Sequence, residues 1–116
     1  MVDIVIGKSF RRGADTISIE DIPKEVQLIG IYFGAHWAPP CRLFTPSLVE
    51  FYQKVNETKK VMEIIFCSND GNEAAFERNY ETMPFLAVPY TDEQRIQSLK
   101  QRYGINGIPT LIVLDA

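Results

Sequence analysis

The stretch Leu28-Ile29-Gly30-Ile31-Tyr32-Phe33 is apolar without alternation, as expected of a strand that is covered on both faces in a parallel sheet. A second apolar run, Ile64-Ile65-Phe66-Cys67, predicts a neighbouring strand. Between the two runs, apolar residues recur at three- and four-residue spacing after Pro40, which predicts a helix with Pro39 and Pro40 in its first turn. A strand, a helix and a parallel strand in this order form a right-handed crossover, so the sequence predicts an α/β fold.

The segment after the second strand predicts a short helix and then an irregular stretch. Residues 72–80 have apolar positions in helical register, and Asn69-Asp70-Gly71 supplies the turn before them. Residues 83–90 are apolar but contain two prolines. Because proline cannot donate to a strand ladder, we expect extended chain lying on the core here rather than a central strand.

Both ends of the chain add further elements. Thr91 and Gln94 form a capping box, which predicts a helix over residues 91–103. Residues 111–114 are apolar and predict another buried strand. Near the N-terminus, isoleucines alternate or nearly so over residues 17–22, which predicts an edge strand.

Length and composition restrict the class of protein. The 116 residues, 46% of them hydrophobic, are enough for one domain with a real core, so we expect a single domain over residues 1–116. A net charge of -3 without a basic stripe argues against nucleic acid as a partner. Residues 1–8 lack the basic and apolar segments of a secretion signal, and no stretch reaches membrane-spanning length. Two cysteines are too few for a disulfide framework, which favours the cytoplasm or the nucleus.

The segment from Gly34 to Arg42 lies where the first predicted strand turns into the helix, the place where open α/β sheets keep their chemistry. A thiol at a helix N-terminus faces unpaired backbone donors and the positive end of the helix dipole, and both favour the thiolate. Two thiols there can open a substrate's disulfide: the first, at the exposed helix cap, attacks, and the second, one turn deeper, releases the product. Cys41 stands at the deeper position, and Ala38 stands at the first.

The residues from Ile31 to Phe51 resemble the Trp-Cys-Pro-Pro-Cys region of nucleoredoxins and tryparedoxins, within the thioredoxin superfamily, and Ala38 is the one departure. The resemblance extends to residues 63–68, 83–90 and 103–111, in the family order. Of the two groups, the central domain of nucleoredoxins is the closer match, and it covers nearly the whole chain.

The resemblance implies a thioredoxin-like fold, with a mixed sheet flanked by helices, and a protein-disulfide reductase ancestry. It also implies that Trp37, Pro39, Pro40, Ile108 and a cis Pro109 contact the substrate, and that a dithiol donates electrons. Tyr32 stands where bacterial thioredoxins keep a buried aspartate. The family's last hairpin strand and C-terminal helix have no counterpart in the sequence, so we expect this chain to be a fragment of a longer one.

Simpler interpretations compete for several of these residues. Cys41, without a second thiol nearby, can be a small buried apolar residue, and Cys67 is expected to be core because it lies in an apolar strand. A zinc site from His36, Cys41 and Cys67 would lack both the paired spacing and a fourth ligand, so no metal and no cofactor is predicted. Trp37 can be a core aromatic, but its place before the motif favours a partly exposed platform for substrate.

Two functional hypotheses stay open. The first is a disulfide reductase domain that is inactive in this form because alanine replaces the attacking cysteine at position 38. Its partners would be protein disulfides and a dithiol donor. The second is a redox-dead binding module that uses the same groove to hold peptides or partner proteins without chemistry.

Overall fold

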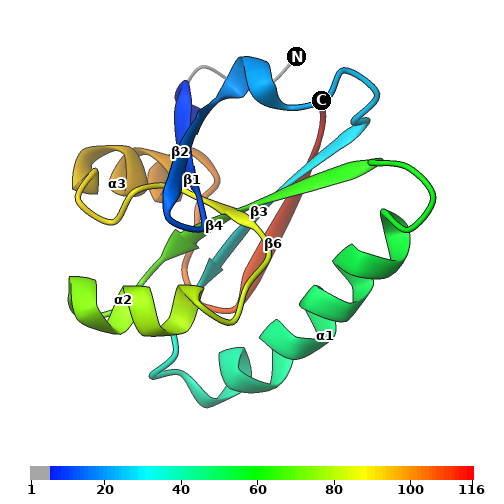
Figure 1. Cartoon of the computed structure of the whole chain (residues 1–116). Coiled ribbons are helices and arrows are strands. Elements are labelled where there is room, and N and C mark those ends of the chain that lie inside the picture. Colours follow the sequence, from blue (N-terminus) through cyan, green and yellow to red (C-terminus); the bar gives the residue numbers. More distant parts are fainter. Residues whose placement is uncertain (1–5) are drawn as a thin grey trace.

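The computed structural model describes residues 6–116 and contains one mixed β-sheet (Figure 1). Strands from the N-terminal and C-terminal parts of the chain both belong to this sheet. Most of the N-terminal segment that we searched for a secretion signal therefore lies outside the described residues. In sheet order, the strands are β2 (Asp15–Ser18), β1 (Ser9–Arg12), β5 (Leu86–Ala87), β4 (Met62–Ser68), β3 (Leu28–Gly34) and β6 (Thr110–Asp115). The helices are α1 (Pro39–Val55), α2 (Glu73–Tyr80) and α3 (Glu93–Arg102), with a 3-10 turn, η2 (Ile19–Asp21).

The two central strands confirm the predicted α/β core. β3 and β4 pair in parallel over their whole length, from Leu28 opposite Met62 to Gly34 opposite Ser68, and β6 runs antiparallel on the other side of β3. All of β4 and all of β3 after Leu28 are buried. α1 connects these two strands as the crossover helix. Because both strands are covered on both faces, they read as continuous apolar runs in the sequence.

Helices cover the two faces of the sheet (Figure 1). On one face, the core joins residues of α1 and α2 to inward-facing residues of β3 and β4: Leu48, Tyr52, Phe76 and Tyr80 with Tyr32, Ile64 and Phe66. On the other face, α3 contributes Ile96 and Leu99, which pack with Ile29, Ile31, Phe33 and Ile65. Among the helices of residues 6–116, none combines the length and the apolar character that a bilayer crossing requires.

The structure corrects the prediction for residues 83–90. Leu86 and Ala87 form β5, which lies inside the sheet, parallel to β4 on one side and antiparallel to β1 on the other. Pro84 and Pro89 stand just outside this strand, so neither proline occupies a paired position. The prolines therefore limit the length of the strand but do not exclude it from the sheet interior.

Three smaller corrections concern the ends of elements. The N-cap of α3 is Asp92, not Thr91: an Asp92 carboxylate oxygen accepts the backbone N–H of Arg95 at 3.2 Å, and the other accepts its Nε–H at 2.9 Å. β6 is less buried than predicted, with Val113 50% exposed, because β6 pairs only with β3 and lies at the sheet edge. The predicted edge strand near the N-terminus is β2, but it ends at Ser18, which is the N-cap of η2.

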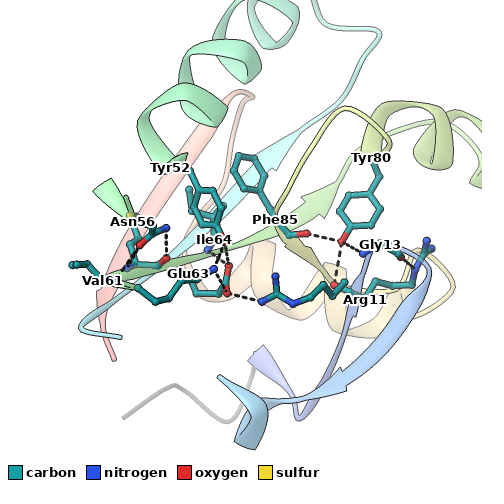
Figure 2. A network of polar contacts seen from close by, with 12 residues as sticks. Arg11, Gly13, Tyr52, Asn56, Val61, Glu63, Ile64, Tyr80 and Phe85 are labelled. Carbon is teal, nitrogen blue, oxygen red and sulfur yellow. Dashed lines mark hydrogen bonds and ion pairs between the residues drawn. The ribbon is translucent and has the colours of Figure 1, made fainter. Parts of the chain in front are cut away.

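A buried carboxylate holds the amino-terminal end of β4 to its neighbours (Figure 2). Glu63 is fully buried, and its Oε1 accepts hydrogen bonds from the Tyr52 hydroxyl (2.8 Å) and the Ile64 backbone N–H (3.1 Å). Its Oε2 contacts Arg12 at 2.9 Å and Lys60 at 3.3 Å. A buried charge is tolerated only when it is paired and hydrogen-bonded, and Glu63 satisfies both conditions. It thereby joins β1, α1 and β4.

We expect Glu63→Gln to lower the free energy of unfolding by about 1.5–3 kcal/mol, because it removes the charged partner of Arg12 and Lys60 and the charge-assisted bonds. The matched control is Glu50→Gln on the exposed side of α1, expected to change stability by less than about 0.5 kcal/mol. Urea denaturation followed by circular dichroism measures both. Equal stability of the two variants would show that the Glu63 charge contributes nothing.

Candidate functional site

The segment from Gly34 to Arg42, called the motif from here on, lies at the carboxyl end of β3 and leads into α1. Ala38 is the N-cap of α1, and Pro39 and Pro40 are its first two residues. Neither proline has an N–H group, and the N–H groups of Cys41 and Arg42 both bond the Ala38 carbonyl oxygen, at 2.9 and 3.3 Å. The expectation of unpaired donors at this helix end is therefore wrong, because the donors are either missing or already bonded.

A groove of about 500 Å³ runs beside the motif. One wall is the motif itself, and the other is the loop between α3 and β6: Trp37, Ala38, Pro39 and Pro40 face Ile105, Asn106, Gly107 and Ile108. Asn69 and Lys100 complete the lining. The peptide bond between Ile108 and Pro109 is cis, as the resemblance implied. Ala38 is only 5% exposed, so position 38 is less open than expected although it lines the groove.

Trp37 is partly exposed, as expected, and its role as a platform for substrate stays a prediction. Its side chain is 61% exposed at the side of the groove, and its indole N–H donates to the Asn69 backbone oxygen at 2.9 Å. This bond fixes the polar end of the ring while its apolar face stays available to a ligand.

Cys41 does not line this groove. It is 2% exposed and lies against a second cavity of about 300 Å³, on the side of the motif that faces α2, with His36, Arg42 and Asn79. Cys41 is thus buried one helical turn after Ala38, and its role as the second thiol of the site stays a prediction. Pro39 and Pro40 are themselves exposed, so burial of the thiol comes from its place in the inward-facing turn of α1.

Tyr32 lies behind Cys41 in the core. Its hydroxyl shares a 2.6 Å hydrogen bond with the Thr45 hydroxyl. A Cβ at position 34 would come within 2.7 Å of the Tyr32 ring, so Gly34 is required for the ring to lie there. The pKa of Tyr32 is raised to about 12, chiefly because the ring is buried; the bond to Thr45 opposes this rise, and the nearby Cys41 thiol adds to it. The chain thus keeps a neutral hydroxyl, not a carboxylate, behind the deeper thiol.

Asp70 connects the motif to the loop after β4, a role that the sequence did not reveal because residues 69–71 indicated only a turn. The Asp70 carboxylate is buried and accepts hydrogen bonds from the His36 backbone N–H (2.9 Å), the Ser68 hydroxyl (2.6 Å) and the Asn79 amide (3.3 Å). Its backbone oxygen also accepts the Tyr90 hydroxyl at 2.7 Å. These bonds hold the loop before α1 in place relative to α2.

The second cysteine belongs to the core, as predicted. Cys67 is fully buried in β4, both cysteines are free thiols, and burial raises the pKa of Cys67 to about 12. Within residues 6–116, no group of three or more histidine, cysteine, aspartate or glutamate side chains is arranged to hold a metal ion.

The family of the chain follows from comparison with known proteins. A family model described as thioredoxin-like matches residues 26–116, from just before β3 to the end of β6. The chain belongs to the thioredoxin-like family. The fold is the one expected from this assignment, and the relatives found within the family include nucleoredoxins and tryparedoxins.

The chain is similar to three relatives over nearly its whole length. Nucleoredoxin of Mus musculus is 48% identical over 113 residues, which are 97% of this chain and 26% of that protein. The structure of tryparedoxin II from C. fasciculata superposes with a TM-score of 0.87 at 34% identity, covering 94% of this chain and 70% of that one. A tryparedoxin II complexed with glutathionylspermidine gives a TM-score of 0.85 at 32% identity, covering 92% and 73%. The chain spans about a quarter of the length of the nucleoredoxins that it matches.

The raised pKa of Tyr32 predicts a change of stability at alkaline pH. The unfolded chain loses this proton near pH 10, its ordinary value, whereas the folded chain keeps it to about pH 12, so the free energy of unfolding falls as the pH rises from 10 to 12. In Tyr32→Phe this part of the fall is absent, and the slope between pH 10 and 12 becomes shallower. Urea denaturation at a series of pH values measures it. Equal slopes for the two proteins would contradict the shift.

Proposed function

We propose that this chain is a thiol-disulfide exchange domain in which the attacking position is occupied by Ala38, so that this form does not turn over. The observation that supports the proposal is the placement of residue 38 at the N-cap of α1, beside the groove, with Cys41 buried one turn later. A thiol at position 38 would meet a substrate first, and the thiol of Cys41 would follow.

The exchange that such a pair performs moves two electrons. A thiolate at position 38 attacks one sulfur of the substrate disulfide, the substrate S–S bond breaks, and one substrate thiolate leaves. The Cys41 thiolate then attacks the sulfur at position 38, which forms a bond between residues 38 and 41 and releases the second substrate thiol. A dithiol donor reduces that bond again by the same two steps. The substrate is reduced and the donor is oxidised.

Cys41 alone supports at most one event in this chain. Its thiol can form a mixed disulfide with a substrate, but no second thiol stands beside it to break that bond. Attack by Cys41 is also slow, because the side chain is 2% exposed and does not line the groove.

The remaining residues of the groove serve to bind the substrate. Trp37, Pro39, Pro40 and Ile108 present apolar surface to an extended segment, and the backbone before Pro109 pairs with it as an added strand would. The substrates are protein disulfides, and the donor is a dithiol. Because free thiols persist in a reducing compartment, the proposed setting is the cytoplasm or the nucleus.

Ala38→Cys tests the site. We expect this variant to form a reversible disulfide with Cys41 and to reduce insulin in the presence of dithiothreitol well above the rate of the parent chain, because the attacking thiol is restored. Turbidity of the precipitating insulin chains follows the reaction. The sulfur atoms of residues three apart in the first turn are within bonding reach.

Two control variants accompany this test. Ala38→Ser adds a side chain of similar size without a thiol and should stay inactive. Ala38→Cys combined with Cys41→Ser should accumulate the mixed disulfide with substrate. If Ala38→Cys folds, forms its disulfide and still shows no reduction above background, the motif is not the catalytic site.

The groove favours a second candidate function, a binding module that holds peptides without chemistry, because its lining needs no thiol. In this case peptides bind the chain as it stands, and Trp37→Ala weakens them by roughly 30-fold, as is typical of an aromatic anchor at the centre of an interface. Phe51→Ala, which changes an exposed aromatic residue of α1 outside the groove lining, is the control. Calorimetry measures both. Equal affinities for the two variants would remove Trp37 from the binding site.

A further inference from the structure

The groove beside the motif continues into a second, polar cavity. This cavity of about 330 Å³ lies between the loop after β4 and α3, and its lining includes Asp70, Tyr90, Glu93 and Gln97. Asn69 and Lys100 line both the groove and this cavity. A ligand that leaves the groove at these two residues therefore enters the polar cavity directly.

One wall of the polar cavity is a charged side of α3. Glu93, Gln97 and Lys100 follow at spacings of four and three residues, so they lie on the same side of the helix. A rise of 1.5 Å per residue separates the ends of this row by about 10 Å. Lys100 stands at the junction with the groove, whereas Glu93 lines the polar cavity and not the groove. The wall is thus positive near the motif and negative farther away.

These two charges are available to a ligand. Within residues 6–116, neither Glu93 nor Lys100 takes part in an ion pair. The other charged group in the lining, Asp70, is 6% exposed, and its carboxylate is already bonded to three donors. The polarity of the cavity is therefore set by Lys100 at one end and Glu93 at the other.

An unsatisfied polar atom marks the junction. The Asn69 side-chain oxygen Oδ1 is buried without a hydrogen-bond partner, the one such side-chain atom in the described part of the chain. An unpaired buried acceptor carries a desolvation cost. The oxygen itself is covered, so a ligand N–H would pair with it only after the amide turns toward the cavity. Such pairing would remove the cost, and it would favour a peptide over an apolar ligand.

We propose that the polar cavity is an extension of the groove that selects peptide partners by charge. An acidic side chain of the peptide pairs with Lys100, and a basic side chain about three residues farther along the peptide pairs with Glu93. Beyond the groove, three residues of polyproline II chain advance about 9 Å and bring side chains i and i+3 to the same side of the backbone, which matches the separation of the two charges along α3. This inference rests on the proposed peptide-binding function of the groove and adds the charge order of the partner.

Five synthetic peptides test the charge order. Each has serine at the position that would meet residue 38. Two peptides carry an acidic residue near the serine and a basic residue three positions beyond it. In one of these peptides both charged residues lie on the N-terminal side of the serine, and in the other both lie on the C-terminal side. Two more have the charges exchanged, and the fifth carries glutamine at those positions. Trp37 is the only tryptophan, so its fluorescence reports occupancy of the groove.

We expect one acidic-near peptide to bind roughly two- to tenfold more tightly than its charge-exchanged counterpart at low ionic strength, with the difference reduced by salt. In the double variant Glu93→Lys with Lys100→Glu, the preference should invert. The readout is the ratio of the two affinities within each protein, so a general loss of binding does not affect it. If the double variant unfolds, the pair Glu93→Gln and Lys100→Gln should abolish the preference instead.

Each other outcome decides a different question. If the glutamine peptide binds but charge order has no effect on affinity in the parent chain, the extension is overturned while the groove stands. A preference that persists unchanged in the charge-swapped or the glutamine variant assigns the selectivity to other residues and also overturns it. Because Trp37→Ala has no tryptophan, calorimetry compares its affinities with those of the parent chain. If none of the five peptides binds more tightly to the parent chain than to Trp37→Ala, the proposed groove fails, and the charge preference fails with it.

Discussion

The parallel pairing of β3 with β4 is the constraint on which the rest of the structure depends. Because the register runs from Leu28 opposite Met62 to Gly34 opposite Ser68, both strands end at the same level. Their carboxyl ends therefore deliver the loop before α1 and the loop before α2 side by side. A shift of this register by one residue would turn every buried side chain of a strand to the opposite face and would separate the two loops.

Once the loops are adjacent, polar bonds fix their relative position. Asp70 holds the backbone of His36, and the carbonyl of Asn69 holds the indole of Trp37, so two consecutive residues after β4 anchor two consecutive residues after β3. The buried Glu63 connects elements at the other end of β4, where it bonds Arg12 of β1 and Tyr52 of α1. The exposed Trp37 side chain is therefore held by a bond to the residue after β4, and both β3 and β4 are largely buried.

Sequence reasoning predicted those features that depend on local pattern. The continuous apolar runs, the helix that begins with two prolines and the core position of Cys67 follow from residues close together in the chain. The two-residue strand at Leu86 escaped prediction because it exists only through its neighbours β1 and β4. Asn69 and Lys100 were missed as groove residues for the same reason, since a turn and a helix far apart in sequence place them together. The assignment of position 38 as the first thiol position came from the family resemblance, because no local sequence pattern indicates a missing cysteine.

The first turn of α1 determines what a substitution at position 38 costs in stability. An N-cap side chain normally stabilises a helix by accepting a bond from one of its first free N–H groups, and its replacement by alanine then costs about 0.5–2 kcal/mol. Here two of those groups are absent, at Pro39 and Pro40, and the next two already bond the carbonyl of residue 38. The side chain at position 38 therefore has no helix-capping role, and a substitution there removes no capping bond. In the proposed exchange domain, one substitution at this position would add or remove the attacking thiol without the loss of a helix cap.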